Sequence, residues 1–259
     1  MQEMTKLPDM NSRYDLLIHK LVSVDINATT SHDYVVMDGF VFGFGFSAGT
    51  TALMVAAQDN NYAVVKALID SGACINTVNA DGFTALILAA WKGHRKIVEI
   101  LIEHGAFTDL RVRGGDSALT LACSTRRKSR KAIIELLINN GAHVDTLNDV
   151  GRWALNWLLC QHPGPEEVVM FIREGASVNA ANLDGSTPLT IVADSGRLDL
   201  TELLLKNNAT AGLNDALVRA IRNGHHDVEN RLLLAGADPT IKTDGRSAIE
   251  WKEYLTKYE

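Results

Sequence analysis

The 259 residues carry a net charge of −6, with 46% apolar and 22% charged side chains. A chain of this length and composition can bury a sizeable core in one large or two small domains, and we expect a soluble folded protein. The acidic balance disfavours general nucleic-acid binding, which needs a basic surface, and no apolar run approaches the roughly 20 residues of a membrane span.

The N-terminal segment and the cysteines bear on the compartment. MQEMTKLPDMNSRYD, at the start of the chain, has no apolar stretch of the kind that a secretory signal requires. Cys74, Cys123 and Cys160 are odd in number and far apart, which favours neither a disulfide framework nor a zinc site. We therefore expect a cytoplasmic protein, with the nucleus as an alternative, and no signal peptide, membrane segment, metal or cofactor.

The first predicted elements are a helix within residues 13–29, RYDLLIHKLVSVDINAT, and a β-hairpin after it. In YVVMDGFVFGFGF, residues 34–46, Asp38-Gly39 is a two-residue turn signal with β-forming residues on both sides. This turn predicts pairing of Met37 with Phe40, of Val36 with Val41 and of Val35 with Phe42. Strand alternation gives one face of the hairpin the side chains of Val35, Met37, Phe40, Phe42, Phe44 and Phe46.

Two interpretations of this aromatic face stay open. In the first, the face covers the end of the structure that follows, because a stable monomer seldom exposes a large apolar strip. In the second, the face contacts a partner. A nucleotide-binding loop is disfavoured, because the spacing of Gly43, Gly45 and Gly49 misses the dinucleotide fingerprint by one residue and the Gly-Lys-Ser/Thr ending of a P-loop is missing.

From residue 51 onward the chain repeats itself. Phrases such as Thr84-Ala85-Leu86 begin at residues 51, 84, 117, 153, 187, 215 and 247, at intervals of 33, 33, 36, 34, 28 and 32 residues. Each of the first six is followed by a phrase such as LIEHGAFTD, and most are preceded by a glycine turn. In residues 85–90, ALILAA, apolar side chains surround a short helix, which must be buried on more than one side. Thr84 is its expected cap and Gly93 its expected end.

This pattern resembles the ankyrin-repeat family, most clearly in DGFTALILAAWKGHRKIVEILIEHGA, residues 81–106. The resemblance runs from about residue 49 to the C-terminus. It implies an all-α solenoid of helix-turn-helix repeats joined by β-hairpin loops, with one long inserted β-hairpin near the N-terminus. We divide the chain into a partial capping repeat at 1–28, the inserted aromatic β-hairpin at 29–48, six repeats at 49–240 and a capping half-repeat at 241–259.

No catalytic constellation stands out. His94 occupies the Gly-His position of its repeat, where a helix-end hydrogen bond is the expected role. His225-His226 point in different directions on a helix, and Glu166-Glu167 is an ordinary helix start. The chain also lacks HExxH and CxxC. We therefore predict a protein that is not an enzyme.

The resemblance implies a partner protein bound along a concave face of hairpin tips and inner helices. The hairpin-tip candidates are Ala80, Asp81, Phe83, Arg113, Gly114, Asp116, Asp149, Val150, Arg152, Leu183 and Asp184. The inner-helix candidates are Gln58, Asp59, Trp91, Lys92, Ser124, Thr125, Gln161, Asp194 and Ser195.

Three of the tryptophans are expected to have different structural roles. Trp91 follows the small pair Ala89-Ala90, so it either faces the groove as a binding residue or packs against Phe83. Trp157 aligns with Leu88 and is predicted to be core. Trp153 stands at the capping position and is predicted to cover the next hairpin.

One repeat concentrates basic residues. The cluster consists of Arg111, Arg113, Arg126, Arg127, Lys128, Arg130 and Lys131. It either steers an acidic segment of a partner or is a solvated turn. Asn76 and Asn179 lie where the family can carry asparagine hydroxylation, although a hairpin hydrogen bond is the expected role.

These patterns predict a non-catalytic protein-protein interaction module without a small-molecule substrate. The alternatives are an inhibitor or immunity-type protein that blocks a partner enzyme, the recognition part of a longer chain and, more remotely, an enzyme or nucleotide binder.

Overall fold

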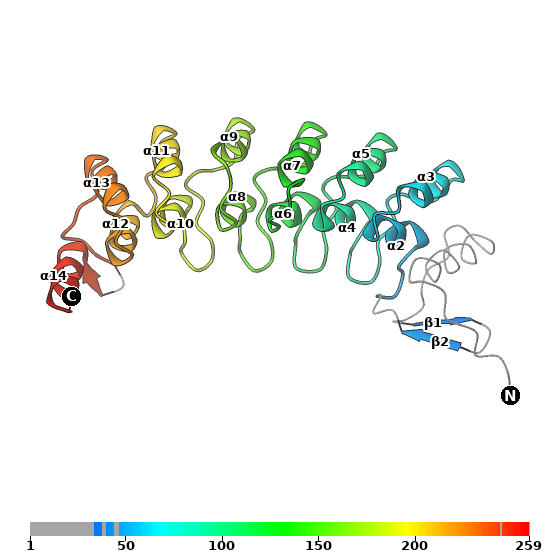
Figure 1. Ribbon diagram of the computed structural model, residues 1–259, viewed down its shortest axis with the longest axis horizontal. Helices are drawn as coiled ribbons and strands as arrows, with labels where there is room; N and C mark the ends of the chain where they lie inside the picture. Colours follow the sequence, from blue (N-terminus) through cyan, green and yellow to red (C-terminus); the bar gives the residue numbers. More distant parts are fainter. Residues whose placement is uncertain (1–33, 38–39, 44–46, 244, 259) are drawn as a thin grey trace. The chain divides into compact units, whose positions relative to one another are not determined.

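The computed structural model describes residues 34–37, 40–43, 47–243 and 245–258 (Figure 1). The predicted helix within 13–29, the turn Asp38-Gly39 and the side chains of Phe44 and Phe46 lie outside the described residues. The chain divides into two compact units, residues 1–113 and 114–259.

The first unit contains two strands and two helix pairs among its described residues. Its elements are β1 (Tyr34–Met37), β2 (Phe40–Gly43), α2 (Ala52–Gln58), α3 (Tyr62–Asp70), α4 (Ala85–Lys92) and α5 (Arg95–Glu103). Antiparallel pairing joins Met37 to Phe40, Val36 to Val41 and Val35 to Phe42, which is the register that the turn signal predicts. The side chains of β1 and β2 are outside the description, so the role of the aromatic face stays a prediction.

The described residues of the second unit form four helix pairs, a short hairpin and a last helix. Its elements are α6 (Ala118–Cys123), α7 (Arg130–Asn139), α8 (Ala154–Leu159), α9 (Pro165–Arg173), α10 (Pro188–Asp194), α11 (Leu198–Lys206), α12 (Leu213–Arg222), α13 (His226–Leu234), β3 (Lys242–Thr243), β4 (Arg246–Ser247) and α14 (Ala248–Tyr258). The inner helices α6, α8, α10 and α12 form one layer, and the outer helices α7, α9, α11 and α13 form the other (Figure 1).

Packing explains the unequal character of the two helix layers. All six residues from Ala85 to Ala90 are buried in α4, because this inner helix contacts both α2 and its own outer helix α5. In α5, burial is confined to one face, with Ile97, Val98, Ile100 and Leu101 inside. Only stacked pairs therefore bury the apolar surface of an inner helix.

Each inner helix that begins after a Ser or Thr is capped by that side chain. Thr84 Oγ1 accepts a hydrogen bond from the Ile87 N–H at 3.1 Å, and Thr51, Ser117 and Thr187 make the same contact. Trp153, which stands at this position before α8, makes no cap. The capping expected for Thr84 and the left-handed end expected at Gly93 are both observed.

Thr84→Ala is expected to lower the free energy of unfolding by about 1 kcal/mol, because one N–H at the start of α4 loses its acceptor. Urea denaturation followed by circular dichroism measures the change. Thr84→Ser, which keeps the hydroxyl, is the control and should lose much less. Equal losses in the two variants would assign the effect to the buried methyl group instead.

Main-chain hydrogen bonds connect successive hairpin tips within each unit. In the first unit, Ala80 N–H donates to Ala48 O and Arg113 N–H donates to Asp81 O, both at 2.7 Å. In the second, Asp149 N–H donates to Gly114 O at 2.8 Å and Leu183 N–H donates to Gly151 O at 2.9 Å. We call these contacts the tip ladder. They fix the position of each tip against the one before it.

The last part of the second unit departs from the regular repeat. The loop from α11 to α12 holds no hairpin, as the short interval of 28 residues predicts. Gly212 begins α12 at φ +71°, and a Cβ there would lie 2.8 Å from Thr187 Oγ1. The strands β3 and β4 then lead into α14, which packs on α12.

Candidate functional site

Trp91 is the most exposed aromatic side chain on the inner helices of the first unit. It lies in the last turn of α4 and is 39% exposed. Its indole stacks on Phe83 with ring centroids 6.0 Å apart and an interplanar angle of 26°, and Lys92 Nζ lies 4.4 Å from the ring centroid. Trp91 therefore packs against Phe83 and is still partly exposed to solvent, while its role as a binding residue stays a prediction.

Polar groups around Trp91 fix this end of α4. His94 Nε2 lies 2.9 Å from Gln58 O, the helix-end hydrogen bond expected from the sequence. Burial raises the pKa of Asp59, and the nearby His94 and Lys92 partly oppose that rise. Arg113 lies exposed at the tip that ends this unit.

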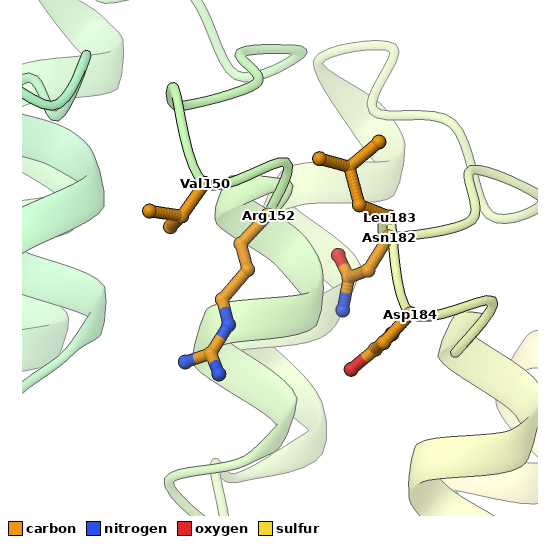
Figure 2. A pocket seen from close by; sticks show the side chains of 5 residues that line it. All are labelled: Val150, Arg152, Asn182, Leu183 and Asp184. Atoms are coloured by element: carbon orange, nitrogen blue, oxygen red, sulfur yellow. The ribbon is translucent and has the colours of Figure 1, made fainter.

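Two adjacent hairpin tips of the second unit surround an open depression of about 580 Å³ (Figure 2). Its lining consists of Val150, Arg152, Asn182, Leu183 and Asp184. Leu183 is 79% exposed and Val150 is 65% exposed, so the rim is unusually apolar for a loop surface. A backbone hydrogen bond from Ser186 lowers the pKa of Asp184 and keeps it anionic, with Arg152 adding to the effect.

The position of Trp157 corrects the prediction that it is core. Leu88, its counterpart in α4, is 6% exposed, whereas Trp157 is only half-buried and carries the guanidinium of Arg152 at 4.6 Å from its ring centroid. The indole is larger than the leucine side chain and extends to the hairpin tip. Trp153 behaves as predicted, because its Nε1–H donates to Ala181 O of the next hairpin at 3.0 Å.

The structure gives the members of the basic cluster different surroundings. Arg126, Arg127 and Lys128 are exposed, and Arg126 Nε donates to Gln161 Oε1 at 3.1 Å. Arg130 is instead buried with a carboxylate, which corrects its place in the cluster, and Lys131 pairs with Glu166 at 2.6 Å. Arg111 and Arg113 belong to the other compact unit.

The Arg130–Glu167 pair is the most enclosed ion pair that the described residues show. Two parallel hydrogen bonds of 2.7 and 2.8 Å join the guanidinium to the carboxylate, and the side chains are 10% and 7% exposed. Arg130 also donates to Thr125 O and Gln161 O. Burial alone would raise the pKa of Glu167, but the bonds from Arg130 and from the Gly164 N–H hold it below its ordinary value.

Several inner-helix candidates contribute through their carbonyls. The carbonyls of Gln58 and Asp194 accept hydrogen bonds from His94 and His225 in the following repeat, and the carbonyl of Gln161 accepts one from Arg130 in the preceding repeat. Ser124, Thr125 and Ser195 are partly exposed, and their hydroxyls donate to carbonyls of their own helices. Gln58, Gln161 and Asp194 therefore join adjacent repeats, whereas the three hydroxyls bond within their own repeats.

Asn76 and Asn179 make the hairpin hydrogen bonds expected of them. Asn76 Nδ2 donates to Gly105 O at 2.9 Å, and its Oδ1 accepts from the Phe107 N–H at 2.8 Å. Asn179 Nδ2 donates to Asn208 O at 3.0 Å, while its Oδ1 accepts from the Thr210 and Ala211 N–H groups. Both amides therefore connect one repeat to the next.

A cluster at the C-terminal end was missed by sequence reasoning. Arg222 and Arg246 both lie over Trp251, next to Tyr254. Alignment of the repeats contains a usable signal, because Arg222 stands two residues before Gly224 as Trp91 stands two residues before Gly93. The sequence prediction treated residues 241–259 only as a capping half-repeat, so it did not anticipate that α14 supplies Trp251 and Tyr254 to this cluster.

Among the described residues, no group of three or more His, Cys, Asp or Glu side chains could hold a metal ion. None of the helices in that part of the chain has the length and apolar character needed to cross a membrane. Cys74, Cys123 and Cys160 are not in disulfide bonds, and burial raises the pKa of the Cys123 thiol. Phe40 and Phe42 belong to β2, and Phe44 lies outside the description.

Stacked helix pairs with linked hairpin tips define an all-α solenoid, and the sequence comparisons agree. The chain belongs to the ankyrin-repeat family: the model for ankyrin repeats (3 copies) matches residues 15–113 and 157–243. Ankyrin repeats are generally protein-protein interaction modules and are typically non-catalytic.

Three relatives illustrate the range of proteins with similar repeats. The chain is 28% identical over 113 residues to protein glp-1 of Caenorhabditis elegans, covering 40% of this chain and 9% of that protein. It is 35% identical over 80 residues to ankyrin repeat and SAM domain-containing protein 6 of Rattus norvegicus, covering 28% and 9%. It is 28% identical over 167 residues to the putative ankyrin repeat protein YahD of Escherichia coli, covering 62% and 81%. The match thus spans less than a tenth of the first two proteins.

Proposed function

We propose that this chain is a non-catalytic module that binds a partner protein through its inner-helix ends and hairpin tips. The observation that carries the proposal is Trp91, a large aromatic side chain that is 39% exposed and yet held between Phe83 and Lys92. Exposed tryptophans with fixed orientation are typical of binding hot spots. Because the indole is already ordered, little side-chain entropy is lost on binding.

The second unit offers its own contact surface. The rim of the depression presents Val150 and Leu183, with Arg152 and Asp184 supplying charges of opposite sign. The exposed turn of Arg126, Arg127 and Lys128 suits an acidic segment of the partner, as Arg113 does in the first unit. We add Phe40, Phe42 and Phe44 of the inserted hairpin as a further proposed contact.

The chemistry of the described residues supports a non-catalytic role. His94 and His225 are engaged with backbone carbonyls of the preceding repeat. Cys74, Cys123 and Cys160 are not in disulfide bonds, which supports a reducing compartment, and we propose the cytoplasm or the nucleus. Turnover of nucleotide or peptide by the purified chain would contradict this part of the proposal.

Trp91→Ala is expected to weaken partner binding by at least about 2 kcal/mol, or about 30-fold, because a hot-spot indole is lost. Partners are first captured from a lysate on the immobilised chain and identified, and the affinity of the purified partner is then measured by calorimetry. Tyr62→Ala is the matched control, since Tyr62 is a 44% exposed aromatic residue on the outer helix α3.

The control should bind as the unchanged chain does. Circular dichroism verifies that both variants are folded. An affinity that is the same for Trp91→Ala and Tyr62→Ala would exclude the inner-helix end of α4 as the binding surface.

A further inference from the structure

Two arginines share one indole at the C-terminal end of the second unit. The guanidinium carbons of Arg222, at the end of α12, and Arg246, in β4, each lie 4.9 Å from the ring centroid of Trp251 in α14. Arg246 also lies 4.5 Å from the ring centroid of Tyr254, which meets Trp251 edge to face at 5.8 Å. We call Arg222, Arg246, Trp251 and Tyr254 the C-terminal arginine cluster.

The carboxylates near this cluster are already engaged. Glu250 binds Lys242 at 2.7 Å and accepts a hydrogen bond from the Ser247 N–H at 2.9 Å. The hydrogen bond from Lys242 lowers the pKa of Glu250, and Arg246 adds to this effect without forming an ion pair with the carboxylate. Glu229 is buried and binds Lys252 and His226. Within the described part of the chain, neither Arg222 nor Arg246 has a carboxylate partner.

Other arginines of the same unit behave differently. Arg130, Arg197 and Arg219 each bind a carboxylate oxygen at 2.7 to 3.0 Å. Trp157, the other tryptophan of this unit with a stacked cation, carries one arginine instead of two. An aromatic face attracts a guanidinium but leaves the N–H donors at its edge without acceptors. Two like charges on one ring also repel each other, and a bound anion offsets that repulsion.

We propose that the C-terminal arginine cluster binds an acidic peptide segment of a partner protein through the side-chain carboxylates of Asp or Glu. Each guanidinium presents a planar fork that matches a carboxylate with two hydrogen bonds, and stacking on the aromatic rings fixes its orientation in advance. Tyr254, 42% exposed, adds apolar surface for the residues next to the carboxylates. The inference rests on the proposed function and names the chemistry of one part of the partner.

The charge of the whole chain favours this location. With a net charge of −6, the protein repels an acidic segment over most of its surface. Arg222 and Arg246 are two exposed arginines to which no carboxylate of the described residues is bound, so they oppose that field locally. Electrostatic complementarity of this kind chooses the binding position and raises the association rate, and it weakens as salt is added.

The test uses a fluorescein-labelled peptide of sequence GSEEEEGS and the full chain, with fluorescence anisotropy at low ionic strength as the readout. GSQQQQGS is the uncharged control. We expect the glutamate peptide to bind and the glutamine peptide not to bind. Arg222→Gln and Arg246→Gln should each weaken binding about tenfold, and Arg246→Lys should recover only part of the loss, because lysine keeps the charge without the fork.

Two further measurements locate the site. The indole N–H signal of Trp251, assigned by its loss in Trp251→Phe, should shift in a nitrogen-correlated NMR spectrum when the glutamate peptide is added. A double change of Arg95 and Lys96 to Gln, two exposed residues of α5, should leave the affinity within about twofold, since they lie outside the C-terminal arginine cluster and outside the proposed contact surfaces. Melting curves verify that each variant is folded.

The outcomes separate the two proposals. Undiminished binding in Arg222→Gln and Arg246→Gln, or an equal loss in the double variant of Arg95 and Lys96, overturns the C-terminal site. A phosphoserine peptide that binds more than tenfold tighter than GSEEEEGS overturns the carboxylate assignment. The Trp91→Ala experiment does not depend on the peptide measurements. The proposed function can therefore fail while the C-terminal site is confirmed, and the C-terminal site can fail while the proposed function is confirmed.

Discussion

Glu167→Ala is expected to lower the free energy of unfolding by about 3–5 kcal/mol, because it leaves the guanidinium of Arg130 buried without its carboxylate. The two remaining acceptors of Arg130, Thr125 O and Gln161 O, are uncharged and cannot replace it. The Gly164 N–H, which donates to Glu167 Oε2 at 2.9 Å, also loses its acceptor. Urea denaturation monitored by circular dichroism measures the change.

Glu166→Ala is the matched control one residue away. The Lys131–Glu166 pair has side chains that are 47% and 77% exposed, so its removal should leave the denaturation midpoint nearly unchanged. If both substitutions lower the free energy of unfolding by the same amount, the buried pair does not stabilise this part of the unit more than a surface pair does.

The same ion pair predicts a pH dependence with a defined sign. The pKa of Glu167 lies below its ordinary value of 4.5, so ionised Glu167 stabilises the folded state fully above that pH. The stabilisation is lost as the pH falls through the lower folded-state pKa. Glu167→Gln should therefore show a shallower loss of stability in acid than the unchanged chain.

Gly82→Ala should cost about 2–4 kcal/mol, because it combines backbone strain with a clash. Gly82 has φ +84°, and a Cβ there would lie 2.8 Å from both Arg111 O and Val112 Cα. These are main-chain atoms of the next hairpin, which cannot move without breaking the nearby bond from the Arg113 N–H to Asp81 O. Thermal and urea unfolding both report the effect.

Gly72→Ala separates strain from crowding. Gly72 has nearly the same φ, +87°, but a Cβ there meets nothing within 4 Å. Its cost should be about 1 kcal/mol, the penalty of the left-handed conformation alone. Equal destabilisation by the two variants would show that the hairpin yields to the added methyl group.

The repeat architecture could be predicted from the sequence because its signals are local and recur. Thr84 and Gly93 begin and end α4 where the pattern places them, and the interval of 28 residues correctly indicates a missing hairpin before α12. A single motif would not have sufficed to predict a repeat architecture.

The domain boundaries that we drew from the sequence stay a prediction.

The character of individual side chains was harder to predict, because it depends on residues far away in the sequence. Arg130 looks like its basic neighbours, yet its carboxylate lies 37 positions later, in the next repeat. Trp157 occupies an apolar core position, but its size carries the ring out to Arg152. Arg222, Arg246 and Trp251 lie in three separate elements, α12, β4 and α14. No local sequence pattern therefore identifies the cluster that they form.

The tip ladder has a consequence for how this surface can change over evolution. Its bonds use only main-chain N–H and C=O groups, as between Leu183 and Gly151. The exposed side chains at the tips, including Arg113, Val150 and Leu183, therefore carry none of the bonds that align the hairpins. Substitutions at these positions can alter which partner is recognised while the alignment of the tips is inherited unchanged. A tip glycine such as Gly115 is constrained instead, because it has φ +80° and a Cβ there would lie 2.7 Å from the Asp149 N of the next tip.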